Sequence, residues 1–154
     1  MIARMIAALI VTSVTGLSVR CGSAVPPPAA LDTAHDPCAY CRMIVSDRHF
    51  SAQIVAPFEE AKFFDDLGCL ANYLKTSDPL SPRAVVYVAD HSTLAWIPAQ
   101  EAVFTRVDAL TAPMGSHVVA HESNTSRAAD PSARSGTPIE RQAVFPSGLP
   151  GATR

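Results

Sequence analysis

The segment DPCAYCRMIV at residues 36–45 constrains this chain more than any other. It brings together two thiols and one thioether, those of Cys38, Cys41 and Met43, at the point where the β-forming residues of a folded domain begin. Cysteine and methionine sulfurs are soft donors that suit Cu(I), and the few carboxylates nearby make a Mg2+ or Ca2+ site a poor match. Metal handling is therefore the first hypothesis.

The cysteine pair by itself leaves several interpretations open. In an exported protein, Cys38 and Cys41 can form a structural disulfide, a redox dithiol or half of a four-ligand metal site. A closed zinc site needs a second cysteine pair, and the other cysteines of the chain, Cys21 and Cys69, are isolated. A thioredoxin-like motif opens a helix, whereas residues 43–45 favour a strand.

Cys41 and Met43 are the more informative pair. Residues two apart on an extended segment project from the same face, so this thiolate and thioether can bind one ion. The alternative is that Met43 is a core residue beside a disulfide. The segment PMGSH at residues 113–117 offers a second candidate, because Met114 lies on a predicted turn and His117 adds an imidazole that also binds copper.

The remaining cysteine and histidines of the predicted domain suggest structural or surface positions. Cys69 falls on the apolar face of a predicted helix and is interpreted as a buried structural thiol. Four single histidines on loops or strand ends are predicted to be exposed to solvent; they are His35, His49, His91 and His121.

The amino terminus has the pattern of an export signal. Residues 1–20 combine the basic Arg4 with an apolar run that is short for a membrane span. Residues 21–34, rich in proline and alanine, predict an extended tether that begins at Cys21. Two processing routes are open: acylation of Cys21, which would anchor the protein to a membrane, and ordinary signal cleavage after Ala24.

The chain from 35 to 122 predicts a small α+β domain with an antiparallel or mixed sheet. A helix from about residue 67 to 75, capped by Asp65 or Asp66, ends at the Asp-Pro pair 78–79. The predicted strands are two hairpins, 43–45 with 51–55 and 84–88 with 94–97, together with 63–64 and 118–120. Residues 100–105 fit a strand or a helical turn, and 123–154 predict a mostly disordered tail with weak docking at 143–145.

Several classes of function find no support in the sequence. The formal net charge is -2 and the chain has no lysine or arginine cluster, which argues against nucleic-acid binding. The chain also lacks a GxSxG motif, a glycine-rich phosphate loop and an HExxH motif. A hydrolase, nucleotide enzyme or zinc peptidase would have no residues to work with. The metal-handling hypothesis predicts a binding protein, not an enzyme.

Five segments together resemble the NosL family of exported copper-binding accessory proteins. They are DPCAYCRMIV at 36–45, SAQI at 51–54, FFDDLGCL at 63–70, WIPA at 96–99 and PMGSH at 113–117. The resemblance implies small ββαβ units similar to part of organomercurial lyase. It also implies a periplasmic Cu(I) metallochaperone that serves nitrous oxide reductase or its assembly transporter, as a lipoprotein if Cys21 is acylated and as a soluble protein otherwise.

The resemblance also implies a ligand set. The Cys-x-Met of the family falls on Cys41 and Met43, and its later Pro-Met-Gly falls on Met114. Cys38 is an addition to the family pattern; a disulfide between Cys38 and Cys41 would have to be reduced before metal binds. Together with His117, these residues make up the predicted metal site.

Two rival functions remain, one from the cysteine pair and one from the fold relation that the resemblance implies. The first is an exported thiol-disulfide protein that uses Cys38 and Cys41. The second is an enzyme like organomercurial lyase, which would need a carboxylate beside the thiols; Asp36 is the nearest in sequence.

Overall fold

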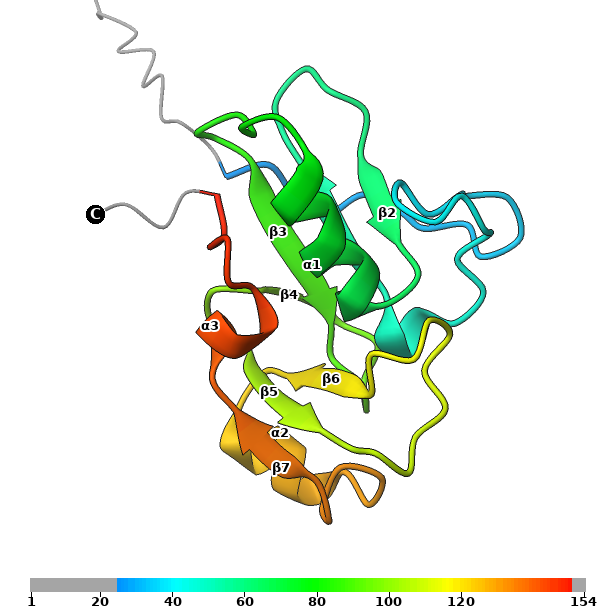
Figure 1. The fold of residues 1–154 in the computed structure, drawn as a ribbon, viewed down its shortest axis with the longest axis vertical. Helices are drawn as coiled ribbons and strands as arrows, with labels where there is room; N and C mark the ends of the chain where they lie inside the picture. Colours follow the sequence, from blue (N-terminus) through cyan, green and yellow to red (C-terminus); the bar gives the residue numbers. More distant parts are fainter. Residues whose placement is uncertain (1–24, 151–154) are drawn as a thin grey trace, which may run out of the picture.

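The computed structural model describes residues 25–150 of the chain (Figure 1). The predicted signal segment, Cys21 and the start of the predicted tether lie outside these residues. No helix in the described part is both long enough and apolar enough to cross a membrane.

Residues 52–139 build two antiparallel sheets (Figure 1). The first has the order β2-β1-β3-β4 and consists of β1 (Ala52–Val55), β2 (Lys62–Phe64), β3 (Val85–Ala89) and β4 (Trp96–Pro98). The second has the order β6-β5-β7 and consists of β5 (Val103–Arg106), β6 (Val118–His121) and β7 (Thr137–Ile139). The helices are α1 (Leu67–Thr76), α2 (Asn124–Ala129), α3 (Arg141–Val144) and the short 3-10 helix η1 (Arg48–Phe50). The predicted α+β class is confirmed.

Helix α1 connects β2 to β3 and lies across the first sheet, which completes the predicted ββαβ unit (Figure 1). Its beginning agrees with the sequence prediction, because the Asp66 carboxylate caps the helix by accepting a hydrogen bond from the Cys69 N–H at 2.9 Å. Leu67 and Leu70 are fully buried toward the sheet. The helix ends at Thr76, shortly before the Asp-Pro pair that the sequence predicts to stop it.

One hydrophobic core joins the two sheets. Phe64 from β2 and Phe104 from β5 are buried in the same cluster, which also contains Phe145 from the end of the chain. Where the sheets meet, Asp90 forms a parallel bridge with Ala120, and the His91 N–H donates to the Ala120 carbonyl at 2.9 Å. The end of β3 is therefore held against β6.

Only one of the two strands predicted for the first hairpin is confirmed. Residues 43–45 do not form a strand, and β1 pairs with β2 and β3 instead. A single bridge between Pro37 and Ile44 remains of the predicted arm, and η1 separates it from β1. The other predicted strands are confirmed, and the ambiguous segment 100–105 contributes β5.

The structure departs from the predicted tail between residues 123 and 150. This segment contains α2, α3 and β7, and β7 adds to the free edge of β5. Docking at 143–145 is confirmed: Phe145 is 1% exposed, and its ring centroid lies 5.6 Å from that of Phe104. The segment has few apolar residues, so no local sequence pattern predicts that it is ordered. Its order depends on the pairing of β7 with β5.

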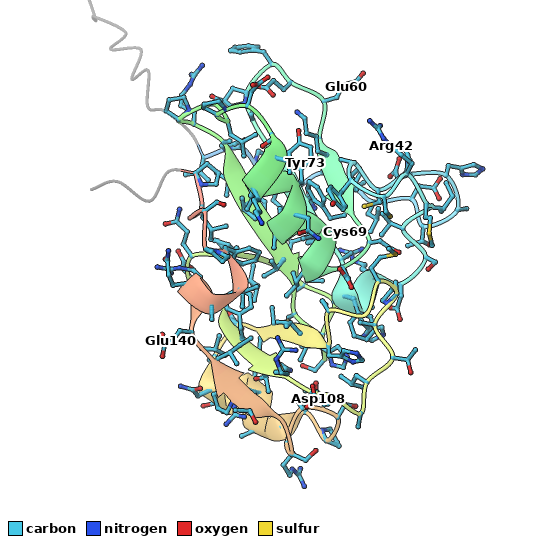
Figure 2. The ribbon with its side chains drawn as sticks, viewed as in Figure 1. Arg42, Glu60, Cys69, Tyr73, Asp108 and Glu140 are labelled. Carbon is cyan, nitrogen blue, oxygen red and sulfur yellow. The ribbon has the colours of Figure 1, made fainter. Side chains whose placement is uncertain are left out.

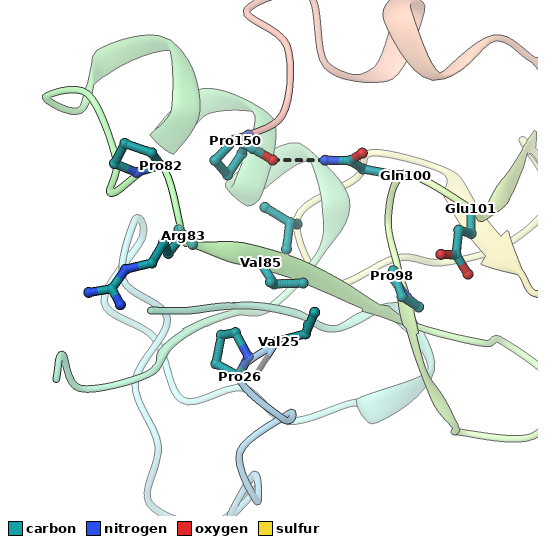
Figure 3. A pocket seen from close by; sticks show the side chains of 11 residues that line it. Val25, Pro26, Pro82, Arg83, Val85, Pro98, Gln100, Glu101 and Pro150 are labelled. Carbon is teal, nitrogen blue, oxygen red and sulfur yellow. Dashed lines mark hydrogen bonds between the residues drawn. The ribbon is translucent and has the colours of Figure 1, made fainter. Parts of the chain in front are cut away.

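The described part of the predicted tether follows the first sheet closely. The Pro26 carbonyl accepts a hydrogen bond from the Tyr87 hydroxyl at 2.7 Å. The Ala29 N–H donates to the Gln53 side-chain oxygen, and the Ala29 carbonyl accepts from the Gln53 side-chain nitrogen. A surface pocket of about 320 Å³ lies where this segment meets Pro150, whose carbonyl accepts a hydrogen bond from the Gln100 side chain. Figure 3 shows the residues that line this pocket.

Candidate metal centre

The predicted sulfur motif forms a tight loop over residues 38–43. The Cys38 N–H donates to the Met43 carbonyl at 2.7 Å, and the Arg42 N–H donates to the Cys38 carbonyl at 3.0 Å. Arg42 has a φ of 70°, a left-handed conformation that non-glycine residues seldom adopt. The loop therefore turns back on itself, and Cys41 returns toward Cys38.

This loop packs against β2 and the start of α1. Cys38 bridges to Phe63, and the Ala39 N–H donates to the Phe63 carbonyl at 2.8 Å. Because α1 begins directly after β2, its first turn carries Cys69 to the same place. Figure 2 shows Cys69 on α1 and Arg42 on the neighbouring loop.

Three cysteines consequently form one cluster. The sulfur atoms of Cys38, Cys41 and Cys69 all lie within 4.8 Å of one another, and all three are free thiols. Cys38 and Cys69 are buried, whereas Cys41 is partly exposed. Cys69 is buried as predicted, but the sequence interpretation missed that its sulfur joins the other two. The capping Asp66, three residues earlier, was the available signal, because it places Cys69 in the first helical turn.

The three thiols differ in acidity. Burial raises the pKa of Cys38, but hydrogen bonds from the N–H groups of Cys41, Asp65 and Tyr40 and from the Cys41 thiol outweigh burial, so the net pKa is lowered. For Cys41 and Cys69, burial raises the pKa, and the neighbouring Cys38 sulfur raises it further. Cys38 is therefore the first of the three to become a thiolate, the form that binds a soft metal.

The two predicted methionine ligands lie on exposed loops. Met43 is 52% exposed and Met114 is 44% exposed. Because Arg42 has a positive φ, Cys41 and Met43 do not sit on the extended segment from which their convergence was predicted. Their joint binding of an ion stays a prediction.

Met114 is tied to the start of the helix that carries Cys69. One oxygen of Asp66, Oδ2, accepts hydrogen bonds from the N–H groups of Met114 and Ser116 at 3.1 and 3.2 Å. The other, Oδ1, caps α1. His117 does not belong to the cysteine cluster; its Nδ1 lies 2.8 Å from the Leu110 carbonyl oxygen.

The prediction that all four single histidines are exposed is wrong for two of them. His35 and His49 are exposed, but His91 is 8% exposed and His121 is fully buried. Both lie at the junction of the two sheets, where β6 is buried along its whole length. With Asp130 they form a second group whose donor atoms lie within 4.8 Å of one another. Sequence reasoning missed this group, since it depends on how the sheets pack.

Comparisons with known proteins agree with the sequence resemblance. The family model for NosL matches residues 28–140. Among solved structures, the fold is similar to the crystal structure of the copper chaperone NosL from Shewanella denitrificans, with a TM-score of 0.51 and 23% sequence identity over 68% of this chain and 86% of that chain. No curated protein matches the sequence. Because the family model spans most of the described residues, the chain belongs to the NosL family.

Proposed function

We propose that this protein carries Cu(I) on the cluster of Cys38, Cys41 and Cys69 and passes it to a client metalloprotein. The observation that carries the proposal is the approach of three free sulfur atoms to within 4.8 Å at the junction of a loop and a helix. Thiolates are soft ligands that select Cu(I) over Mg2+, Ca2+ and other hard ions. The solved copper chaperone with a similar fold supports the same function.

The arrangement of the cluster suits transfer. Cys41 is the partly exposed member, so an incoming ligand from a client reaches the metal at Cys41. The buried Cys38 and Cys69 keep the metal bound during this exchange. Cu(I) accepts few ligands, and a site with one accessible sulfur releases it by stepwise ligand exchange. Met43 and Met114, exposed on two loops, are the predicted thioether ligands at the rim.

The family resemblance supports a proposal for the client and the location. We assign nitrous oxide reductase, or the transporter that assists its assembly, as the recipient of copper. The protein would act in the periplasm after export, anchored through an acylated Cys21 or soluble after cleavage at Ala24. In this role the protein transfers an ion and catalyses no reaction.

Titration of the reduced, unlipidated chain from Cys21 onward with Cu(I), against a chromophoric competitor, tests the proposal. The native chain should bind one equivalent, and Cys41→Ala should abolish stoichiometric binding because it removes the accessible thiolate. Cys21→Ser is the matched control, since it removes a cysteine that the cluster does not contain. Unchanged affinity in Cys41→Ala would refute the proposed site.

A thiol-disulfide protein is the second candidate, favoured by the closeness of Cys38 and Cys41 and by the lowered pKa of Cys38. The burial of Cys38 argues against it, because a redox cysteine must be reached by its substrate. An insulin-reduction assay separates the two functions: a copper carrier shows no turnover.

An enzyme like organomercurial lyase has weaker support. Such an enzyme needs a carboxylate beside the thiols, but Oδ2 of Asp36 accepts the Asp32 N–H at 2.8 Å. Asp36 is also absent from the group of donors around the cysteines.

A further inference from the structure

Three buried side chains meet where the two sheets join. His91 follows β3, His121 ends β6 and Asp130 caps the carboxyl end of α2. They are 8%, 0% and 4% exposed, and their donor atoms lie within 4.8 Å of one another. No residue is shared with the cysteine cluster.

One carboxylate oxygen is the focus of the group. Oδ2 of Asp130 lies 2.7 Å from Nδ1 of His91 and 2.9 Å from Nε2 of His121. Burial raises the pKa of Asp130, but hydrogen bonds from His121 and His91 outweigh burial and lower the pKa to about 2. The group therefore combines a buried negative charge with two imidazole nitrogens that point at the same oxygen.

This donor set fits a divalent ion of the zinc class. Imidazole nitrogen and carboxylate oxygen are ligands for Zn2+, which they hold at about 2.0–2.1 Å, so that donor atoms around a tetrahedral ion are about 3.3 Å apart. The two nitrogens would each move outward by roughly half an ångström from Asp130 to admit the ion. Cu(I) prefers the sulfur cluster, so the two sites differ in the metal they select.

We infer that His91, His121 and Asp130 form a second metal site, which binds a zinc-class divalent ion and fixes the α2 segment to the sheets. Helix α2 has no buried side chain, so apolar packing contributes little to holding it in place. Its attachments are polar: Asp90 accepts from the Ser126 hydroxyl at 3.0 Å, and Asp130 contacts the two histidines.

An ion at this position would act on folding more than on transfer. His91 and Asp130 are 39 residues apart, so coordination closes a long loop of the chain. Three protein ligands leave a fourth position for water, and the His91 side chain, 10% exposed, is the member of the group that solvent reaches most. Because all three protein ligands are buried, this site should release its ion slowly, whereas the cysteine cluster exposes one of its ligands.

The test uses the full mature chain with all four cysteines replaced (Cys21→Ser, Cys38→Ser, Cys41→Ser and Cys69→Ser), so that zinc cannot bind to a thiol. After chelator treatment and addition of Zn2+, this chain should retain one zinc per molecule and show a higher Tm. Adding Asp130→Asn or His121→Gln should abolish both effects. A chain that binds no zinc, or binds it equally with Asp130→Asn, would leave only an internal hydrogen-bonded group and overturn the inference.

Co2+ binding to the native chain provides a second readout if the serine variant does not fold. The spectrum should contain a component without thiolate-to-metal charge transfer, and preloading with Cu(I) should leave that component in place. A spectrum that arises from thiolate coordination alone would overturn the inference. The zinc measurement on the serine variant does not depend on whether the cysteine cluster carries copper, so the two proposals can fail separately.

Discussion

The two donor clusters of this protein differ in chemistry, burial and position. The cysteine cluster offers three sulfurs at the junction of a loop and a helix, and one of them, Cys41, is partly exposed. The cluster of His91, His121 and Asp130 offers nitrogen and oxygen atoms at the junction of the two sheets, and all three members are buried. The proposed copper site is thus the one suited to exchange, and the proposed second site is the one suited to retention.

The backbone that carries the cysteine cluster is also less firmly held than the backbone that carries the second cluster. The loop of residues 38–43 relies on a residue with positive φ, Arg42, and on the hydrogen bond that the Ala39 N–H donates to the Phe63 carbonyl of β2. The second cluster sits where Asp90 bridges to Ala120 and β6 is buried throughout. A loop adjusts its ligands to an incoming partner more readily than the ends of packed strands do.

After the loss of binding expected for Cys41→Ala, the largest expected effect is on copper binding by Cys69→Ser. Serine is close to cysteine in size, so the helix stays intact while the cluster loses its third sulfur. We expect the Cu(I) affinity to fall by more than about a hundredfold, since even indirect support of a metal ligand is worth 10–100-fold. Competition titration with a chromophoric Cu(I) ligand measures the change.

The stability of the Cys69→Ser chain is the control for this prediction. If affinity stays native while Tm falls, Cys69 is the structural thiol that its place on an apolar helix face suggests. Copper would then depend on Cys38, Cys41 and the methionines alone.

The second prediction concerns the cluster of His91, His121 and Asp130, which should affect stability and not copper binding. His121→Ala removes one of the two hydrogen-bond partners of the buried Asp130 carboxylate and should lower the free energy of unfolding by about 2 kcal/mol. Cu(I) affinity should stay native in the folded fraction, because the histidine belongs to the other cluster. Urea unfolding and Cu(I) titration on the same sample measure both. His35→Ala, an exposed histidine, is the matched control; a parallel loss of copper binding in His121→Ala alone would contradict the separation of the sites.

Local patterns predicted much of the fold and part of the cysteine cluster. The cap at Asp66, the apolar spacing of α1 and the β-forming runs are local signals, and the structure follows them. Cys38 and Cys41 stand out because the thiols are close in sequence. The cap at Asp66 places Cys69 in the first turn of α1, but the packing of the loop on β2, which brings the other two sulfurs to it, is a contact that no local pattern reports.

The second cluster shows the limit of sequence reasoning more clearly. His121 ends a strand whose residues are all buried because it lies between the β3 end and β5, so alternation along the strand could not reveal its burial. Asp130 lies in a polar segment predicted to be mostly disordered. Its burial is a consequence of long-range pairing by β7 and of the contacts that Asp90 makes with the α2 segment.

A smaller effect is expected for Asp66→Asn. Asparagine is as good a helix cap as aspartate, so Oδ1 can still accept the Cys69 N–H. An amide nitrogen in place of Oδ2 cannot accept from Met114 and Ser116, and the loop should detach from α1. If Met114 is a ligand, Cu(I) affinity should fall about tenfold, or 1.4 kcal/mol. Circular dichroism checks that the helix remains; unchanged affinity with a released loop would remove Met114 from the site.

The smallest effect is expected for Met43→Leu. Leucine keeps the apolar bulk and removes the thioether, so the variant reports on coordination and leaves packing nearly unchanged. Met43 is 52% exposed on the loop that carries Cys41, which suits a weak ligand at the rim better than a primary one. We expect Cu(I) affinity to fall about fivefold, roughly 1 kcal/mol, and Tm to stay within a degree or so. Ile44→Leu, an exposed neighbour without sulfur, is the control. A loss as large as that of Cys69→Ser would make the thioether a main ligand, and the cargo site would then extend from the buried sulfurs to the surface of the loop.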